Sequence, residues 1–210
     1  MANRIRFLLK RLGAVFRKDP ERPLTLEQKL EVLARGGLRL EPPFTIKDLL
    51  RSFPREEYEK PGFDLLLSEL GMTEEGPPWR NYRVNVWTFD TECIEGPGSY
   101  CRIAEQMKLM AEGSLPIENI RDHVDEEAGY AWLAFTYKGE EIRINCKVDS
   151  DWVDPKLFPH FVRLLSRSDP SKTFIYYGSG GQDCILACVT NAVLRELKRA
   201  GINFQPLGST

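Results

Sequence analysis

Histidine is scarce in this chain of 210 residues, which contains only His123 and His160. The five cysteines are dispersed, and no two of them have two residues between them, the spacing typical of a zinc-ligand pair. An odd, scattered set of cysteines also argues against a disulfide framework. The sequence therefore predicts a cytoplasmic protein that has neither a zinc centre nor structural disulfides.

Long apolar runs and phosphate-binding loops are missing as well. No stretch approaches the ~18 apolar residues of a membrane-spanning helix, and the N-terminal third has no glycine-rich phosphate loop. Asp149, Asp151 and Asp154 have the oxygen ligands that a hard cation prefers, but their segment lacks the glycine and the terminal glutamate of a calcium loop. We expect no cofactor and no metal ion.

Charge is present in nearly equal amounts of both signs, but it is unevenly distributed. The net charge of the whole chain is −2. Residues 56–154 carry 22 acidic and 9 basic side chains, a net charge of −13, whereas residues 1–22 carry a net charge of +5. An acidic surface repels nucleic acid and attracts cationic proteins. The pattern therefore favours a protein partner with a basic surface over a nucleic acid.

Residues 1–22 are predicted to form a separate unit. Apolar residues recur at helical spacing within residues 3–17, and Asp19-Pro20-Glu21-Arg22-Pro23 ends that pattern. This basic amphipathic helix and its linker precede a single predicted α+β domain at 23–210. Membrane contact through residues 3–17 is an open alternative that we do not favour, because one short helix without a lipid anchor binds membranes weakly.

Local patterns in the rest of the chain predict both helices and strands. The pairs Thr25/Gln28 and Thr45/Asp48 have the spacing of capping boxes and indicate two helix starts. Periodicity and turn residues predict further helices at 54–59, 62–70, 99–112, 155–166 and 191–200, and strands at 82–89, 117–124, 130–137, 141–148, 173–177, 183–189 and 202–204. We expect an α+β fold with a mostly antiparallel sheet of about five strands flanked by helices, and a helical N-terminal third.

Cys184 is the sharpest candidate for catalysis. It follows Gly180-Gly181-Gln182-Asp183, and His123 or His160 would have to act as its base. Cys184 also alternates with Leu186 along a predicted strand, which is typical of core packing. A strand start supplies neither the helix N-terminus nor the cation that activates a thiol. We favour a non-enzymatic protein and keep a cysteine-dependent hydrolase as an alternative.

Acidic residues concentrate in three predicted loops, at 90–95, 122–127 and 149–154. Trp152 lies within one of these loops, and an aromatic anchor ringed by charge is typical of a protein-binding surface. Trp87 and Trp132, by contrast, lie within predicted strands and are expected to be core or semi-buried residues. If the strands form one sheet, two of the three loops are expected to share an edge.

Three stretches of the chain resemble bacterial immunity-type proteins of polymorphic toxin systems. They are PPWRNYRVNVWTFDTECIE at 77–95, DWVDPKLFPHFVRLL at 151–165 and GGQDCILACVT at 180–190. The resemblance covers residues 24–207 and leaves the basic N-terminal segment outside. It implies a cytoplasmic protein that binds and silences a cognate toxin, and it carries over no catalytic residues.

The charge pattern and this resemblance together predict a protein-binding inhibitor. Carboxylates of the acidic loops are expected to pair with lysine and arginine side chains of the toxin, and one tryptophan is expected to supply apolar contact area. The predicted partner-binding residues are Glu92, Glu95, Asp122, Asp125, Glu126, Glu127, Asp149, Asp151 and Trp152.

Overall fold

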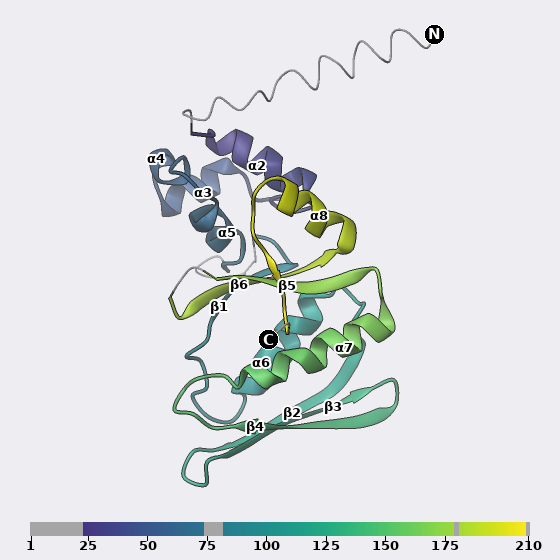
Figure 1. Ribbon diagram of the computed structural model, residues 1–210. Coiled ribbons are helices and arrows are strands. Elements are labelled where there is room, and N and C mark those ends of the chain that lie inside the picture. The colour runs from purple at the N-terminus through teal and green to yellow at the C-terminus, as the bar shows by residue number, and fades with distance from the viewer. Residues whose placement is uncertain (1–22, 74–81, 179–180, 209–210) are drawn as a thin grey trace, which may run out of the picture.

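The computed structural model describes residues 23–73, 82–178 and 181–208. In these ranges the chain forms helices and antiparallel sheets arranged in layers (Figure 1). The predicted α+β class is therefore confirmed. The expected sheet of about five strands is wrong, because the seven strands of the described ranges divide into sheets of four and three strands. The predicted helix at 3–17 lies outside the described residues.

The N-terminal helices form the first layer together with a later helix, α8 Asn191–Arg199, and both predicted capping boxes are present. Thr25 accepts a hydrogen bond from the backbone of Gln28, whose side chain bonds back to Thr25, and Thr45 and Asp48 do the same for the next helix. These N-terminal helices are α2 Leu26–Arg35, α3 Ile46–Ser52, α4 Arg55–Tyr58 and α5 Asp64–Leu70. The part of the N-terminal third that the structure describes is thus helical as expected.

The four-stranded sheet lies beneath these helices and has the order β1-β6-β5-β7. Its strands are β1 Val86–Asp90, β5 Lys172–Gly178, β6 Asp183–Thr190 and β7 Gln205–Pro206, and α8 Asn191–Arg199 follows β6. Along β6, Ile185 and Ala187 pack in one core with the N-terminal helices and α8, whereas Leu186 and Cys188 pack in the other core. The sheet is therefore the shared wall of two hydrophobic cores.

The three-stranded sheet is the predicted meander, β2 Ile117–Asp125, β3 Tyr130–Tyr137 and β4 Glu140–Lys147, in the order β2-β3-β4. Its inner face carries buried apolar side chains such as Leu133, Phe135 and Ile144. The opposite face of this sheet carries polar and aromatic side chains. This alternation places the helices of the middle layer on one side of the meander only.

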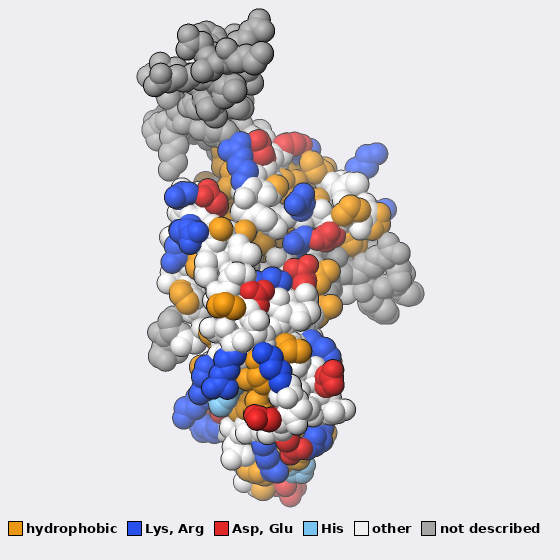
Figure 2. Space-filling model, turned by 90° about the vertical axis from the view of Figure 1, so that its right-hand side faces the viewer, with side chains coloured by type: hydrophobic (Ala, Val, Ile, Leu, Met, Phe, Trp, Pro, Cys, Tyr) orange, Lys and Arg blue, Asp and Glu red, His pale blue; other side chains and the backbone are white. Residues whose placement is uncertain are grey.

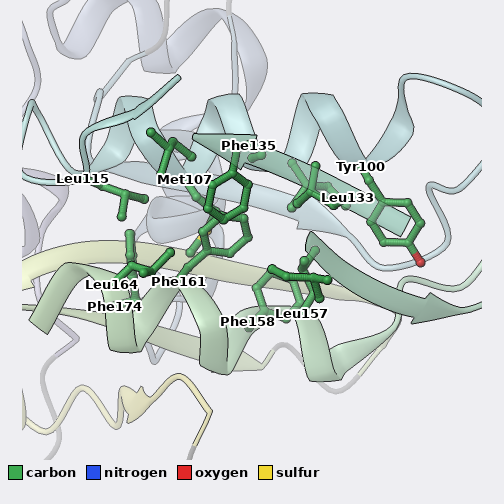
Figure 3. Close-up of a cluster of buried hydrophobic side chains, with 14 of the residues drawn as sticks. Tyr100, Met107, Leu115, Leu133, Phe135, Leu157, Phe158, Phe161, Leu164 and Phe174 are labelled. Atoms are coloured by element: carbon green, nitrogen blue, oxygen red, sulfur yellow. The ribbon is translucent and has the colours of Figure 1, made fainter. Parts of the chain in front are cut away.

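Two helices fill the space between the sheets, α6 Ser99–Met110 and α7 Phe158–Ser168, the latter preceded by the 3₁₀ turn η1 Pro155–Leu157. Figure 3 shows Phe135 of β3 and Phe161 of α7 facing each other in this core. Their rings stack with centroids 5.9 Å apart, and both side chains are fully buried. The resulting order of layers is helices, four-stranded sheet, helices α6 and α7, and three-stranded sheet (Figure 1).

One close backbone contact locks the first layer to the sheet. Gly71 directly follows the last residue of α5, and its carbonyl accepts a hydrogen bond of 2.9 Å from Thr88 N on β1. A Cβ atom at Gly71 would lie 2.4 Å from that same nitrogen. Glycine is thus required here by the close approach of α5 to β1.

Across the described part of the chain, no helix reaches the length and apolar character needed to cross a membrane.

Candidate protein-binding site

Two of the predicted acidic loops are joined by backbone hydrogen bonds. Glu92 and Trp152 form an antiparallel β-bridge. On either side of it, Ile94 N donates to Asp151 O at 2.8 Å and Val153 N donates to Thr91 O at 2.9 Å. The segment after β1 and the segment after β4 are far apart in sequence, and these hydrogen bonds hold them together. The shared edge expected from the sequence depended on a single sheet; the two loops instead follow strands of different sheets and are joined by this isolated bridge.

The turn between β2 and β3 reaches the same end of the molecule. Tyr130, the first residue after the turn, pairs with Lys147, the last residue of β4. The turn is closed by Ala128 N, which donates to Asp125 Oδ1 at 2.9 Å. We call the group formed by residues 90–95, 125–129 and 149–154 the acidic end; it lies at the left of the view in Figure 1.

The acidic end exposes most of its carboxylates and holds few cations. Glu95, Glu126, Glu127, Asp149 and Asp151 are exposed, and Glu92 is half-buried. Lys147 Nζ lies 2.8 Å from Asp149, and Arg102 lies 3.9 Å from Glu95. Both ion pairs are on the surface and contribute little to stability. The opposite end, which faces the viewer in Figure 2, shows lysine and arginine side chains interspersed with aspartate and glutamate.

Trp152 is the aromatic residue of the acidic end, and 43% of its surface is exposed. It borders an open hollow of about 350 Å³ whose other walls include Thr91, Val153 and the buried ring of Phe158. Lys147 and Asp149 lie at the polar rim. An exposed indole beside an apolar hollow and several carboxylates suits the insertion of a side chain from a protein partner.

Asp122, one of the predicted contact residues, is engaged within the fold. Its carboxylate accepts hydrogen bonds from Gly98 N at 2.8 and 3.0 Å and from Cys101 N at 3.0 Å. These N–H groups begin α6 and would otherwise lack partners. Asp154 is similarly engaged, since it accepts bonds from Lys147 N and Lys156 N. Neither carboxylate is free to meet a cationic partner without losing these bonds.

Cys184 lies on β6 between Phe89 of β1 and Gly178 of β5. Burial, reinforced by the neighbouring Asp183, raises the pKa of its thiol to about 12. Of the two histidines, His160 Nδ1 contacts Arg163 at 3.4 Å, and His123 stacks on Trp132 of the other sheet. The surroundings of Cys184 thus favour a neutral thiol, which is the form that lacks nucleophilic reactivity.

Cation ligands are not gathered in the described residues. Within them, no group of three or more histidine, cysteine, aspartate and glutamate side chains has the geometry to hold a metal ion. The carboxylates of the acidic end are spread along loop backbones rather than directed to one point. Their arrangement favours contact with a broad cationic surface.

The sequence interpretation missed one cluster, on the outer face of the three-stranded sheet. Trp132 was expected to be a core or semi-buried residue, and it is half-buried, but on the outer face, between His123 of β2 and Arg143 of β4. The guanidinium carbon of Arg143 lies 4.3 Å from the centroid of the Trp132 ring, and Arg143 Nη2 donates to Tyr130 Oη at 2.6 Å. The sequence feature that could have indicated this position is the alternation of Trp132 with Leu133, which places their side chains on opposite faces of the strand.

Comparison with known proteins adds no assignment: no protein-family model, no curated protein and no solved structure matches this chain.

Proposed function

We propose that the chain is a protein-binding inhibitor of the immunity type, which holds a cognate toxin through the acidic end. The observation that carries the proposal is the backbone pairing of residues 91–94 with residues 151–153. This pairing gives the exposed carboxylates a fixed geometry on either side of Trp152. A preformed acidic surface attracts a cationic protein over a distance and speeds its encounter.

The cytoplasm is the proposed location of this inhibitor, and a toxin with a basic surface is its proposed partner. Glu95, Glu126, Glu127, Asp149 and Asp151 are exposed carboxylates of the acidic end, and Glu92 lies at the bridge. Trp152 supplies the apolar contact area next to the hollow. We assign no catalytic step to the chain.

The test is the rate of association with the protein encoded beside this chain, measured by biolayer interferometry over a range of salt concentrations. We expect fast association that slows steeply as salt rises. The triple variant Glu92→Lys, Glu95→Lys and Asp151→Lys is expected to associate at least about tenfold more slowly and to depend less on salt.

A matched control reverses the same number of charges elsewhere. Glu31, Glu56 and Glu196 are exposed and belong to the helices of the layer remote from the three-stranded sheet. Their replacement by lysine changes the net charge equally but leaves the acidic end intact, so the association rate is expected to stay near that of the unmodified chain. Equal slowing by both variants would show that net charge, and not this surface, controls binding.

A further inference from the structure

The outer face of the three-stranded sheet carries an ordered stack of side chains contributed by all of its strands. His123 of β2, Trp132 of β3 and Arg143 of β4 stand in a row, with the His123 and Trp132 rings inclined by 20° and their centroids 6.0 Å apart. Tyr130 binds the end of Arg143 through its hydroxyl and is 40% exposed. Tryptophan, tyrosine and arginine are the residues that most often dominate binding energy at protein interfaces.

Arg143 differs from the other cations of these three strands. Arg121 has the carboxylate of Glu141 at 2.5 Å, and Lys147 has that of Asp149 at 2.8 Å. In the structure as described, no carboxylate forms an ion pair with Arg143. Its guanidinium is held against Trp132 and bonded once, to Tyr130, which leaves further N–H donors directed at solvent.

This arrangement prepares the guanidinium for a carboxylate from outside. An arginine loses rotamer freedom when it binds an anion, and the contacts with Trp132 and Tyr130 already restrict Arg143 before any partner arrives. A guanidinium also offers paired donors that match the two oxygens of a carboxylate. We infer that the outer face of the three-stranded sheet docks a protein segment in which a carboxylate side chain, flanked by an apolar residue, binds Arg143.

The inference rests on the proposed function and extends it to the chemistry of the partner. The face is continuous with the acidic end, because Tyr130 directly follows the turn at 125–129 and pairs with Lys147. Strands of this length and spacing give the face an area of only about 400 Å², half of the ~800 Å² that a stable interface buries on each partner. The face alone is therefore too small for a stable interface and fits as one part of a larger contact.

A cation beside an acidic surface would also provide selectivity. The carboxylates of the acidic end attract any strongly basic protein, so they discriminate poorly. Arg143 opposes a partner that is basic throughout and favours one whose basic patch adjoins a carboxylate. Nucleic acid is disfavoured on the same face, because Glu126, Glu127 and Asp149 lie next to it and repel phosphates.

The experiment is the selection of a phage-displayed library of short random peptides on the immobilised full chain. We expect one class of enriched peptides with aspartate or glutamate beside an aromatic or aliphatic residue. The affinity of a synthetic peptide of this class, measured by fluorescence anisotropy, is expected to fall at least about tenfold with Arg143→Gln and less with Arg143→Lys. The matched control Arg121→Gln removes the same charge from the same face and is expected to retain binding.

The two proposals fail separately in this selection. The selection tests the proposed function through lysine- or arginine-rich peptides. These peptides should be enriched on the unmodified chain and should not bind the triple variant of the acidic end. The selection tests the present inference through acidic peptides, which should bind the unmodified chain and should not bind the Arg143→Gln variant. The inference is overturned if no acidic peptide is enriched, or if acidic peptides bind the Arg143→Gln chain as tightly as the unmodified chain. Tight binding of a fluorescent oligouridylate that requires Arg143 would overturn it in favour of nucleic acid.

Trp132→Phe tests whether the Trp132 ring contributes to peptide binding by holding the Arg143 guanidinium in place. This variant keeps an aromatic ring but offers a weaker surface for the cation, so we expect an intermediate loss of peptide affinity. Urea unfolding of each variant keeps a change in stability distinct from a change in binding. Normal peptide affinity in Arg143→Gln combined with reduced stability would assign the stack to the fold alone and would contradict the inference.

Discussion

The carboxylate of Asp122 on β2 binds the backbone N–H of Gly98, with both oxygens within 3.0 Å. It thereby caps α6 from a neighbouring strand, and its Oδ2 also accepts a hydrogen bond from Cys101 N. An acidic group at this position also interacts favourably with the positive end of the helix dipole. A residue that composition marks as part of an acidic surface thus has a clear role in holding α6 to the three-stranded sheet.

The first prediction concerns this cap. Asp122→Ala leaves the N–H groups of Gly98 and Cys101 without their acceptor, so we expect the free energy of unfolding to fall by about 1–2 kcal/mol. Asp122→Asn keeps an acceptor oxygen but loses the charge, and we expect a smaller loss. Urea unfolding followed by circular dichroism measures both.

Asp151→Ala is the matched control for the cap. Asp151 is exposed at the acidic end, so its removal is expected to leave unfolding within about 0.5 kcal/mol of the unmodified chain while slowing association with a basic partner. If Asp122→Ala were as stable as Asp151→Ala, the cap would not contribute to the stability of the fold.

The second prediction concerns the reactivity of Cys184. Because its thiol has a pKa of about 12, its thiolate fraction near neutral pH is far below that of a free cysteine with a pKa near ~8.5. We expect alkylation by iodoacetamide at least ~100-fold slower than that of a free thiol, with a rate that rises about tenfold for each pH unit. Peptide mapping by mass spectrometry follows the modification.

Unfolding the chain in urea provides the control, since it removes the burial that raises the pKa of Cys184 and should restore the ordinary rate. Rapid alkylation of the folded chain near neutral pH would favour the cysteine-dependent hydrolase. The same experiment measures the alkylation rates of Cys93 and Cys101. Burial raises the pKa values of these two thiols to about 11, so they should react faster than Cys184.

The third prediction concerns the contact between α5 and β1. Gly71→Ala would place a Cβ 2.4 Å from Thr88 N and 2.8 Å from the carbonyl carbon of Trp87. Both are backbone atoms of a strand and cannot turn aside as a side chain can. We expect a loss of about 1–3 kcal/mol in the free energy of unfolding, measured by thermal and urea denaturation.

Gly178→Ala is the appropriate comparison, because no atom lies within 4 Å of the added Cβ and the backbone there is not left-handed. Its stability should stay within about 0.5 kcal/mol of the unmodified chain. Similar losses in both variants would point to a general cost of replacing glycine instead of the predicted clash.

Local signals in the sequence were sufficient for most elements. Thr25 and Thr45 begin helices as their capping boxes predict, and the period-two pattern from Tyr130 to Tyr137 coincides with β3. The predicted edge strand at 202–204 is displaced to Gln205–Pro206, since a two-residue pairing leaves little periodicity to detect. The positions of helices and strands can therefore be predicted from local sequence patterns, because these positions depend mainly on neighbouring residues.

The number of sheets could not be obtained in the same way. β1 pairs with β6, which follows it only after the whole meander and α7 have intervened. Such long-range pairings have no local signature, so the sequence pattern alone does not separate the two sheets. The same limit explains Asp122 and Trp132: the acceptor role of the first and the stacking partners of the second depend on segments that only the fold brings together.

The four-stranded sheet shares its strands between two hydrophobic cores, since Leu186 packs on one side and Ile185 on the other. If either core unfolded, the apolar side chains on one face of β6 would become exposed to solvent. The helices near the N-terminus and the distant meander are therefore expected to melt in a single cooperative transition, and a fragment that lacks the N-terminal helices would expose an aggregation-prone sheet.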